Sequence, residues 1–455
     1  MKQKCLVLLA LVLVLVSWSS SSVFALNTEA SVDSNSQGLT TVSLPDAMRL
    51  AMQQNTQSLL AEERTREAQG IKEQKTSGLL PHLSAGVSQY SETLNLAALG
   101  FTPASFPGIT NPKLGPFGVF DARITLMQNL FDLTALSEYQ AGKAQLRKAQ
   151  LQESFARQRA GLESGVLYLE LLRVQASSRG NKSDVDAAQK FLVLFRDQHK
   201  SGLATGIDLA RAETQLSQSK SVLIQSQTLE NDTALRLKRS MGVALESSLK
   251  LSDKLSPTLQ GEMPMDQILA EAQEKRLEIQ VANEEIHRTK AEQKAALGRQ
   301  LPSLAAEADV GGSGNRPDQN LDDTYHFGVA LNLPVFDGGA TLGRIKQARS
   351  ETRQAQILYD DIKTQVEQDV RTAFQNLLQT KTQVMTAKQT YELAGRELML
   401  VQDQFRSGVG DSLALVNAEN SLTRAREDYL SALAGYHISR LFLAYSIGEM
   451  EGFKL

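Results

Sequence analysis

The chain has 455 residues, of which 42% are hydrophobic and only 5% aromatic, and its formal charge is −3. This composition is typical of long helices with narrow apolar seams rather than of a thick globular core. Because net charge is low and no long basic run occurs, no nucleic-acid partner is expected.

The N-terminal residues 1–25 are predicted to be a secretory signal peptide. Lys2 and Lys4 precede an apolar run that ends at Val16, and Val23-Phe24-Ala25 predicts cleavage after Ala25. The only cysteine, Cys5, lies before that run, where an acylated cysteine cannot be, so we expect neither a lipid anchor nor a disulfide. Residues 26–42 are polar and are expected to form a flexible leader.

A first structural repeat is predicted over residues 43–256. A helix runs from Leu44 to about Gly78 and is ended by Pro81. The period then changes to that of strands, and alternating apolar residues predict a β-hairpin over 84–130. The remaining expected elements are a long helix over 133–199, a bend over 200–208, a return helix over 209–241 and a polar linker.

The same order returns in a second repeat over residues 264–449, before a short tail over 450–455. After a helix ended by Pro302, the expected elements are a β-hairpin over 303–336, a long helix over 339–405, a bend over 406–413 and a return helix over 414–446. The bend segment Ser201–Glu213 matches Ser407–Glu419 with serine, glycine, leucine, alanine and glutamate at shared positions. One duplicated unit is therefore expected rather than separate domains.

The long helix of the second repeat carries a regular heptad seam. Over 339–405 it would be about 100 Å long at ~1.5 Å per residue, and its seam predicts left-handed supercoiling. In the first repeat, Ser178, Gly180 and Asn181 interrupt the seam, which indicates a bend or bulge. The seam residues of the second repeat are Ile345, Ala348, Thr352, Ala355, Tyr359, Ile362, Val366, Val370, Ala373, Leu377, Thr380, Val384, Ala387, Tyr391, Ala394, Leu398, Val401 and Phe405.

The number of strands predicts an assembly. No segment after the signal has eighteen consecutive apolar residues, so any membrane crossing is left to the strands. Four amphipathic strands cannot close a barrel, and open edges are not tolerated in lipid. At least about eight strands are needed, so two or three chains must combine.

In the order of its elements, the chain resembles the TolC-like outer-membrane efflux proteins over about residues 43–449. The order is helix, Leu-Pro, hairpin, Phe-Asp turn, long helix, glycine-containing bend and return helix, and it occurs twice. The resemblance implies an α+β membrane protein with duplicated long helical hairpins. Four strands per chain would contribute to a homotrimeric, 12-stranded barrel in outer-membrane lipid, with a helical tunnel in the periplasm. It further implies a passive exit duct joined by a periplasmic adaptor, a membrane fusion protein, to an inner-membrane RND, ABC or MFS pump.

The resemblance also assigns roles at the bends. Gly202 and Gly408, with Ser201 and Ser407, match the tip that faces the adaptor, and Asp208 matches an aspartate that closes the tunnel. In the second bend, Phe405 replaces a gate tyrosine and Gly410 an arginine, which leaves Asp208, Asp411, Phe405 and Arg406 as gating candidates.

Simpler readings remain for these residues. The tip glycines would also serve as helix C-caps, and Asp208 as an N-cap. A periplasmic coiled-coil scaffold without membrane insertion is the alternative function, although it leaves the strands unexplained. The scattered histidines and the Gly311–Asn315 cluster, which lacks a following Lys-Ser/Thr, favour neither metal nor phosphate binding, and no cofactor or enzymatic activity is expected.

Overall fold

The computed structural model describes residues 41–102, 104–105, 111–202, 204–255, 264–318, 321–407, 410–450 and 453. All of the described residues belong to one compact unit, Thr40–Leu455. The predicted signal peptide and nearly all of the leader lie outside the described residues, so they stay predictions. Among the helices described, none combines the length and the apolar character needed to cross a bilayer.

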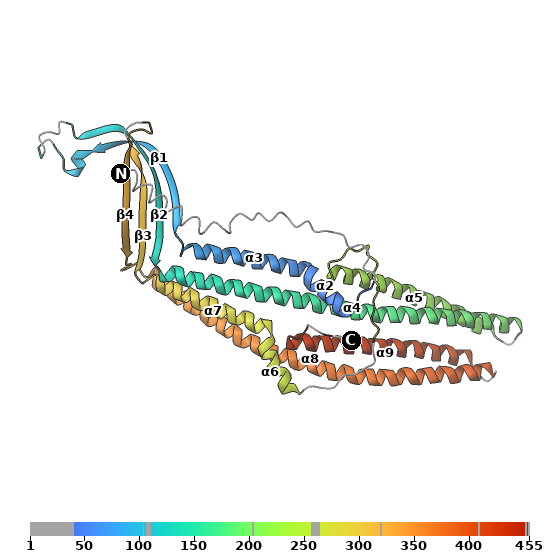
Figure 1. Cartoon of the computed structure of the whole chain (residues 1–455). Helices are drawn as coiled ribbons and strands as arrows, with labels where there is room; N and C mark the ends of the chain where they lie inside the picture. Colours follow the sequence, from blue (N-terminus) through green and yellow to red (C-terminus); the bar gives the residue numbers. More distant parts are fainter. Residues whose placement is uncertain are drawn as a thin grey trace. The chain divides into compact units, whose positions relative to one another are not determined.

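Long helices and four strands make up the unit Thr40–Leu455 (Figure 1). In chain order the elements are α2 (Leu44–Gln54), α3 (Thr56–Ser77), β1 (His82–Asn95), the short 3-10 helix η2 (Leu96–Leu99), β2 (Lys113–Phe131), α4 (Leu133–Lys200), α5 (Gly206–Ser240), α6 (Met265–Lys275), α7 (Leu277–Gly298), β3 (Ser303–Gly314), β4 (Asp322–Asn332), α8 (Ala340–Arg406) and α9 (Ser412–Ile447).

The helix predicted from Leu44 to Gly78 is wrong in one respect, because it breaks at Asn55 into α2 and α3. Asn55 has an extended backbone, with φ −62° and ψ 139°, and its side chain accepts a hydrogen bond from the Gln57 N–H at 2.8 Å. The same side chain donates to the carbonyl of Ser240 at 2.9 Å. Asn55 therefore caps α3 and ties it to the end of α5.

The corresponding helix of the second repeat also breaks, at Arg276, between α6 and α7. Arg276 is buried, and its guanidinium donates to Glu278 at 2.6 Å and to Asp369 on α8 at 3.4 Å. It also lies over the Tyr445 ring at 5.3 Å. This break is held by tertiary contacts, since no side chain caps α7.

The four strands form one antiparallel sheet in the order β1-β2-β3-β4, so β1 and β4 are its edges. The register pairs Ala85 with Ile124, Thr125 with Asp309, and Val310 with Tyr325. The four predicted strands are present, but β4 ends at Asn332, before the predicted end of its hairpin. Pro334 has no backbone N–H to donate to a neighbouring strand, which is consistent with this early end of β4.

One face of β4 exposes its large apolar side chains. Phe327, Val329 and Leu331 are 77%, 56% and 68% exposed. They alternate along the strand, so they lie on the same face. The described residues of a single chain do not cover this face.

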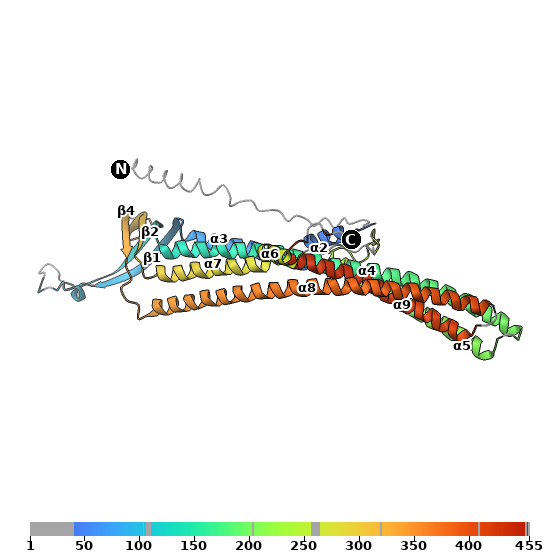
Figure 2. The ribbon, with the colours of Figure 1, turned by 90° about the horizontal axis from the view of Figure 1, so that it is seen from below.

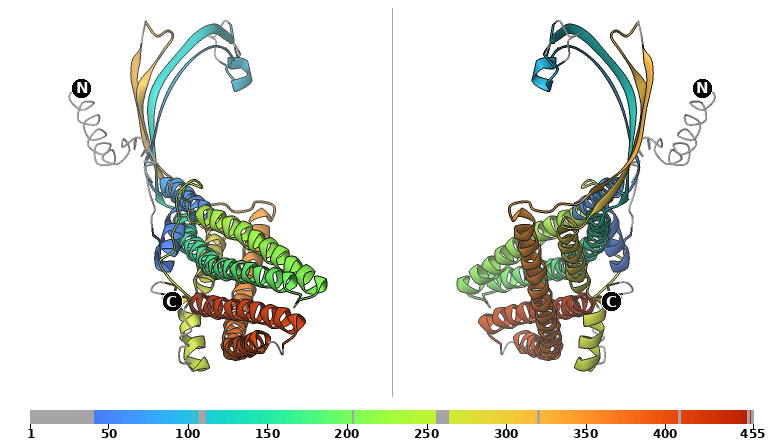
Figure 3. Two further views of the ribbon diagram at one scale, coloured as in Figure 1. Left: turned by 90° about the vertical axis from the view of Figure 1, so that its right-hand side faces the viewer. Right: turned by 90° about the vertical axis from the view of Figure 1, so that its left-hand side faces the viewer.

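The helices pack as two long hairpins, α4 with α5 and α8 with α9 (Figures 2 and 3). The shorter helices α3 and α7 pack on α4, and α7 also packs on α8. The sheet adjoins the ends of these helices, where Asn129 of β2 donates to the carbonyl of Gly78 at 3.0 Å. The hairpin bends lie at the ends of α4 and α8 that are remote from the sheet (Figure 1).

The heptad seam predicted for α8 is confirmed, because nearly all the residues buried on this helix belong to it: Ile345, Ala348, Ala355, Val366, Val370, Ala373, Val384 and Ala394. In contrast, α4 is continuous from Leu133 to Lys200, without the bulge expected near Gly180. Ser178 and Asn181 are buried there, which places polar groups where an apolar seam would normally lie.

The candidate functional site: hairpin tips and the cavity between the hairpins

The first tip begins where α4 ends. Ser201 is the C-cap, with its N–H donating to the carbonyl of Asp197 at 3.1 Å and its hydroxyl to the same oxygen at 3.0 Å. Gly202 follows in the left-handed conformation, at φ +73°, and its N–H donates to the carbonyl of His199 at 3.0 Å. The capping geometry of Gly202 is thus confirmed, whereas adaptor docking stays a prediction.

Asp208 is not the N-cap of α5, as the simpler reading expected. The N-cap is Thr205, whose Oγ accepts from the Asp208 N–H at 3.3 Å, while the Asp208 carboxylate accepts from the Thr205 N–H at 3.0 Å. This reciprocal pair is a capping box. The spacing Thr205-x-x-Asp208 was the available signal, because a hydroxyl residue followed three positions later by an acid predicts such a box.

Asp208 also joins the two tips. Its Oδ1 accepts a hydrogen bond from the Ser412 hydroxyl at 2.5 Å. Arg211 lies 3.7 Å from Asp208 and donates to the Ser412 Oγ at 3.4 Å. Hydrogen bonds from Ser412 and then Thr205 hold the pKa of Asp208 below its ordinary value, because they favour the charged carboxylate.

The second tip is described only in part, since Gly408 lies outside the described residues. Ser407 is the C-cap of α8, and its hydroxyl donates to the carbonyl of Asp403 at 2.8 Å. Arg406 forms an exposed ion pair with the Asp403 carboxylate at 3.8 Å. Asp411 is the N-cap of α9, with its carboxylate accepting from the backbone N–H of Leu413 at 3.1 Å.

Phe405 packs against the first hairpin rather than standing alone at the second tip. Its ring centroid lies 5.2 Å from that of Phe195, at an interplanar angle of 56°. The surrounding apolar cluster comprises Ala188, Leu192, Phe195, Ala212 and Leu216. Gly410 permits the tight turn after Phe405, because a Cβ at Gly410 would lie 2.6 Å from the Phe405 nitrogen.

Further from the tips, a row of polar contacts joins α9 to the first hairpin. Gln215 bonds to Asn420 at 3.1 Å, and Ser177 donates to Glu427 at 2.8 Å. Between these pairs, Asp184 accepts from Thr423 at 3.1 Å and from both terminal nitrogens of Arg426 at 2.9 and 2.6 Å. We call these contacts, with the Asp208–Ser412 bond, the inter-hairpin ladder.

Sequence reasoning missed most of this ladder, although part of its signal was present. Ser177, Asn181 and Asp184 recur at helical spacing, four and three residues apart, and so share one face of α4. A polar stripe on one face of a long helix indicates a polar partner helix. The apolar seam of α4 is interrupted near Gly180 because this polar stripe crosses it there.

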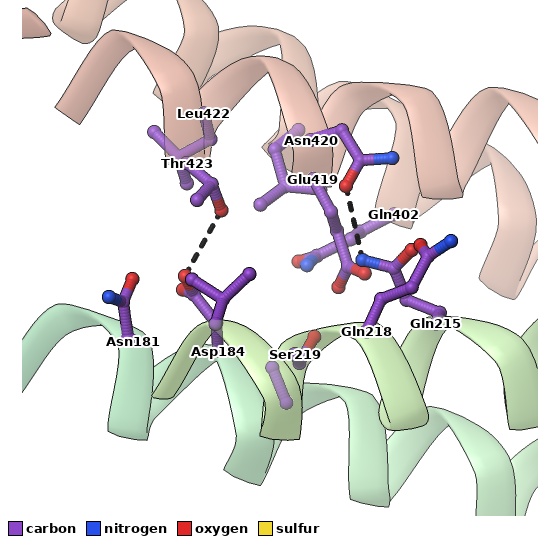
Figure 4. Close-up of a pocket in the computed structure, with 13 residues that line it drawn as sticks. Asn181, Asp184, Gln215, Gln218, Ser219, Gln402, Glu419, Asn420, Leu422 and Thr423 are labelled. Carbon is purple, nitrogen blue, oxygen red and sulfur yellow. Dashed lines mark hydrogen bonds between the residues drawn. The ribbon is translucent and has the colours of Figure 1, made fainter. Parts of the chain in front are cut away.

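A polar cavity of about 410 Å³ lies beside the ladder, lined by residues of α4, α5, α8 and α9 (Figure 4). Asp184 and Glu419 are the charged residues in its lining. Burial raises the pKa of Glu419 to about 7, and the neighbouring carboxylate of Asp184 adds to the rise. Within the described ranges, no group of three or more His, Cys, Asp or Glu side chains is placed to hold a metal ion.

Comparisons with known proteins agree with this architecture. The family model "Outer membrane efflux protein" matches residues 268–449. Alkaline protease secretion protein AprF of Pseudomonas aeruginosa is 28% identical, covering 68% of this chain and 67% of AprF. Outer membrane efflux protein BepC of Brucella suis is 22% identical over 85% of each chain. Outer membrane protein TolC of Escherichia coli is 21% identical over 72% of this chain and 69% of its own.

Solved channels share the fold. The Campylobacter jejuni CmeC outer membrane channel superposes with a TM-score of 0.77 at 16% identity, covering 90% of this chain and 86% of CmeC. VceC of Vibrio cholerae gives a TM-score of 0.75 at 17% identity, over 89% and 96% of the chains. With the duplicated hairpins and the four-stranded sheet already in place, these matches show that the chain is similar in sequence to outer-membrane efflux proteins and shares the fold of solved outer-membrane channels.

Proposed function

We propose that this chain is the outer-membrane exit duct of a tripartite efflux or secretion system, a passive conduit from the periplasm to the exterior. The observation that carries the proposal is the placement of an amphipathic sheet with two free edges at one end of two long hairpins. The relatives are named as outer-membrane efflux and secretion proteins, which supports the same placement in the envelope.

The functional unit in this proposal is a homotrimer. A four-stranded sheet cannot stand alone in lipid, because its edge strands β1 and β4 would leave backbone groups unpaired. Three chains would supply twelve strands, above the minimum of about eight for a bacterial barrel. The exposed apolar side chains of β4 would then meet outer-membrane lipid.

The hairpin tips are the proposed docking surface for a periplasmic adaptor. Gly202 and Ser201 form a bare turn, with no heavy atom within 4 Å of a Cβ position at Gly202. Ser407 and Gly408 hold the matching positions of the second repeat. Asp208, Phe405, Arg406 and Asp411 are proposed to set how firmly the tunnel entrance closes, because Asp208 and Phe405 reach from one hairpin to the other.

Energy for transport would come from an inner-membrane pump of the RND, ABC or MFS class, reached through the adaptor. Among the relatives, AprF is named for the secretion of an alkaline protease and OpmQ of Pseudomonas aeruginosa for the export of pyoverdine. Cargoes as different as a polypeptide and a small molecule therefore occur among the relatives.

Envelope fractionation tests the proposal against the alternative, a periplasmic scaffold. We expect the protein in the outer-membrane fraction, extracted only by detergent, with a detergent-corrected mass of about three chains. Planar-bilayer recordings of this material should show discrete conductance steps. A protein recovered as a monomer without detergent would overturn the duct and favour the scaffold.

A further inference from the structure

Glu419 is half-buried between the two hairpins, and no cation pairs with it among the described residues. Its side chain extends from α9 into the polar cavity, toward α5 and α8 (Figure 4). Among the described residues, its carboxyl has neither an ion pair nor a hydrogen bond, and burial and the charge of Asp184 act on it. A half-buried carboxyl beside a second carboxylate is favoured in its neutral form.

The side chains that face Glu419 from the surrounding helices explain why its neutral form is favoured. On α4, the charged cavity residue is Asp184, which repels a second carboxylate. On α5 and α8 the polar neighbours are the neutral Gln215, Gln218, Ser219 and Gln402. On α9 itself, Arg426 is bound to Asp184, which accepts hydrogen bonds from both of its terminal nitrogens.

The matching residue of the first repeat has different surroundings. Glu213 occupies the same position as Glu419 in the duplicated bend segment. Its side chain is 55% exposed, and it lies 3.8 Å from Arg196. Glu213 is thus exposed and paired with an arginine, whereas Glu419 is half-buried and has no ion pair among the described residues.

From the cavity, the missing cation and the facing Asp184, we infer that Glu419 is a proton-sensitive control on the contact between the two hairpins. When Glu419 is neutral, α9 can close against α4 and α5 along the inter-hairpin ladder. When Glu419 is charged, it repels Asp184 across the cavity and favours separation of the hairpins, which widens the tunnel entrance. This inference deepens the proposed duct and rests on it for the effect on the entrance.

The direction of the pH effect follows from linkage. A solvated glutamate ionises near pH 4.5, whereas Glu419 in the closed arrangement has its pKa raised to about 7. Between these values the separated arrangement loses its proton and the closed one does not, so the closed arrangement becomes less stable as pH rises. The closed-to-open ratio would fall by up to about tenfold per pH unit per proton in this window.

The test compares the wild-type protein with Glu419→Gln and with Glu213→Gln as the matched control. In planar bilayers, the open fraction of wild type and Glu213→Gln should rise as pH is raised from about 5 to about 8. Glu419→Gln keeps a neutral side chain of the same size, so it should stay in the low-pH behaviour throughout. A wild-type pH response in Glu419→Gln would overturn the inference.

Thermal unfolding separates this inference from the proposed duct. The Tm of Glu419→Gln should match that of wild type at about pH 4, where Glu419 and the substituted glutamine are both neutral. At about pH 8 the Tm of Glu419→Gln should exceed that of wild type. This pattern in a protein that forms no channels would refute the duct while retaining the proton-sensitive contact. A Tm difference that is the same at both pH values would refute the proton-sensitive contact, even in a conducting channel.

Discussion

Gly202 follows α4 in a left-handed conformation, with open space where a Cβ would stand. We propose that two roles are combined at this residue. The positive φ serves the end of the helix, whereas the absent side chain leaves the backbone accessible to a partner. Asparagine separates these roles, because it adopts the left-handed conformation more readily than other residues with a side chain.

Gly202→Asn should therefore fold and assemble like wild type but lose export if the adaptor needs a bare backbone. Gly202→Val should cost about 1–2 kcal/mol of tip stability, because a β-branched residue resists positive φ. Export assays and detergent-resistant trimer on gels measure the two effects. Normal export by both variants would contradict docking at Gly202, and loss of trimer in Gly202→Asn would leave a capping role alone.

Asp208 gives the tip a stability that depends on pH. Its pKa in the folded protein is below the ordinary 3.8, chiefly through the hydrogen bond from Ser412, so the carboxylate stabilises the fold above that value. This contribution is lost as pH falls through the lowered pKa. Asp208→Asn should thus lower Tm most at neutral pH and least in acid. Asp428→Asn, at an exposed position of α9, is the control. A Tm deficit in Asp208→Asn that does not shrink in acid would contradict this role.

At the scale of elements, the contact of α4 with α9 depends on a glycine within a helix. Arg426 lies against Gly180, and a Cβ there would stand 2.5 Å from the Arg426 Nε. The Arg426 guanidinium can reach Asp184 because Gly180 has no side chain in its way. A residue that weakens an isolated helix thus permits the strongest part of the inter-hairpin ladder.

Gly180→Ala should destabilise the protein by about 1–3 kcal/mol, because either Arg426 or the α4 backbone must move. Gly70→Ala in α3 is the matched control, since no atom lies within 4 Å of its added Cβ. That variant should gain about 0.5–1 kcal/mol from helix propensity. Denaturant unfolding in detergent measures the change in the free energy of unfolding for both variants. Equal effects of the two substitutions would contradict the packing of Arg426 on Gly180.

Elements determined by local pattern could be predicted from the sequence, and those determined by distant partners could not. The apolar residues of the α8 seam repeat every three or four positions, so the sequence alone predicts which face of α8 is buried. The break at Arg276 was not, because it depends on Glu278, Asp369 and Tyr445, which lie on three different helices. At the candidate site, the position of Gly202 at the end of a helix could be predicted from the local bend sequence. The cavity around Glu419 could not, because it forms only where four helices pack together.

At the scale of the whole molecule, the sheet order determines how copies can join. The two edges belong to different repeats, β1 to the first and β4 to the second. In a closed ring, β4 of one chain would pair with β1 of the next. Each joint would then be identical, and the ring would have no free edge.

Cysteine pairs test this closure, because Cys5 in the predicted signal is the only native cysteine. One cysteine placed on β1 and one on β4 should form a disulfide between chains, giving covalent trimers on non-reducing gels. The control places both cysteines on the central strands β2 and β3, where any bond should stay within one chain. Covalent trimers from the central pair, or none across a scan of edge pairs, would contradict the ring.

The difference between the two hairpin tips bears on the stoichiometry of the proposed export complex. The first tip has Thr205, Asp208 and Ile207 at its turn, and the second has Gly410, Asp411 and Ser412. In the proposed trimer, six tips of two kinds would alternate around the entrance. An adaptor selective for one kind would bind as three copies, whereas an adaptor that accepts both would bind as six. In this proposal, sequence divergence at one tip would change the number of adaptor subunits without altering the barrel.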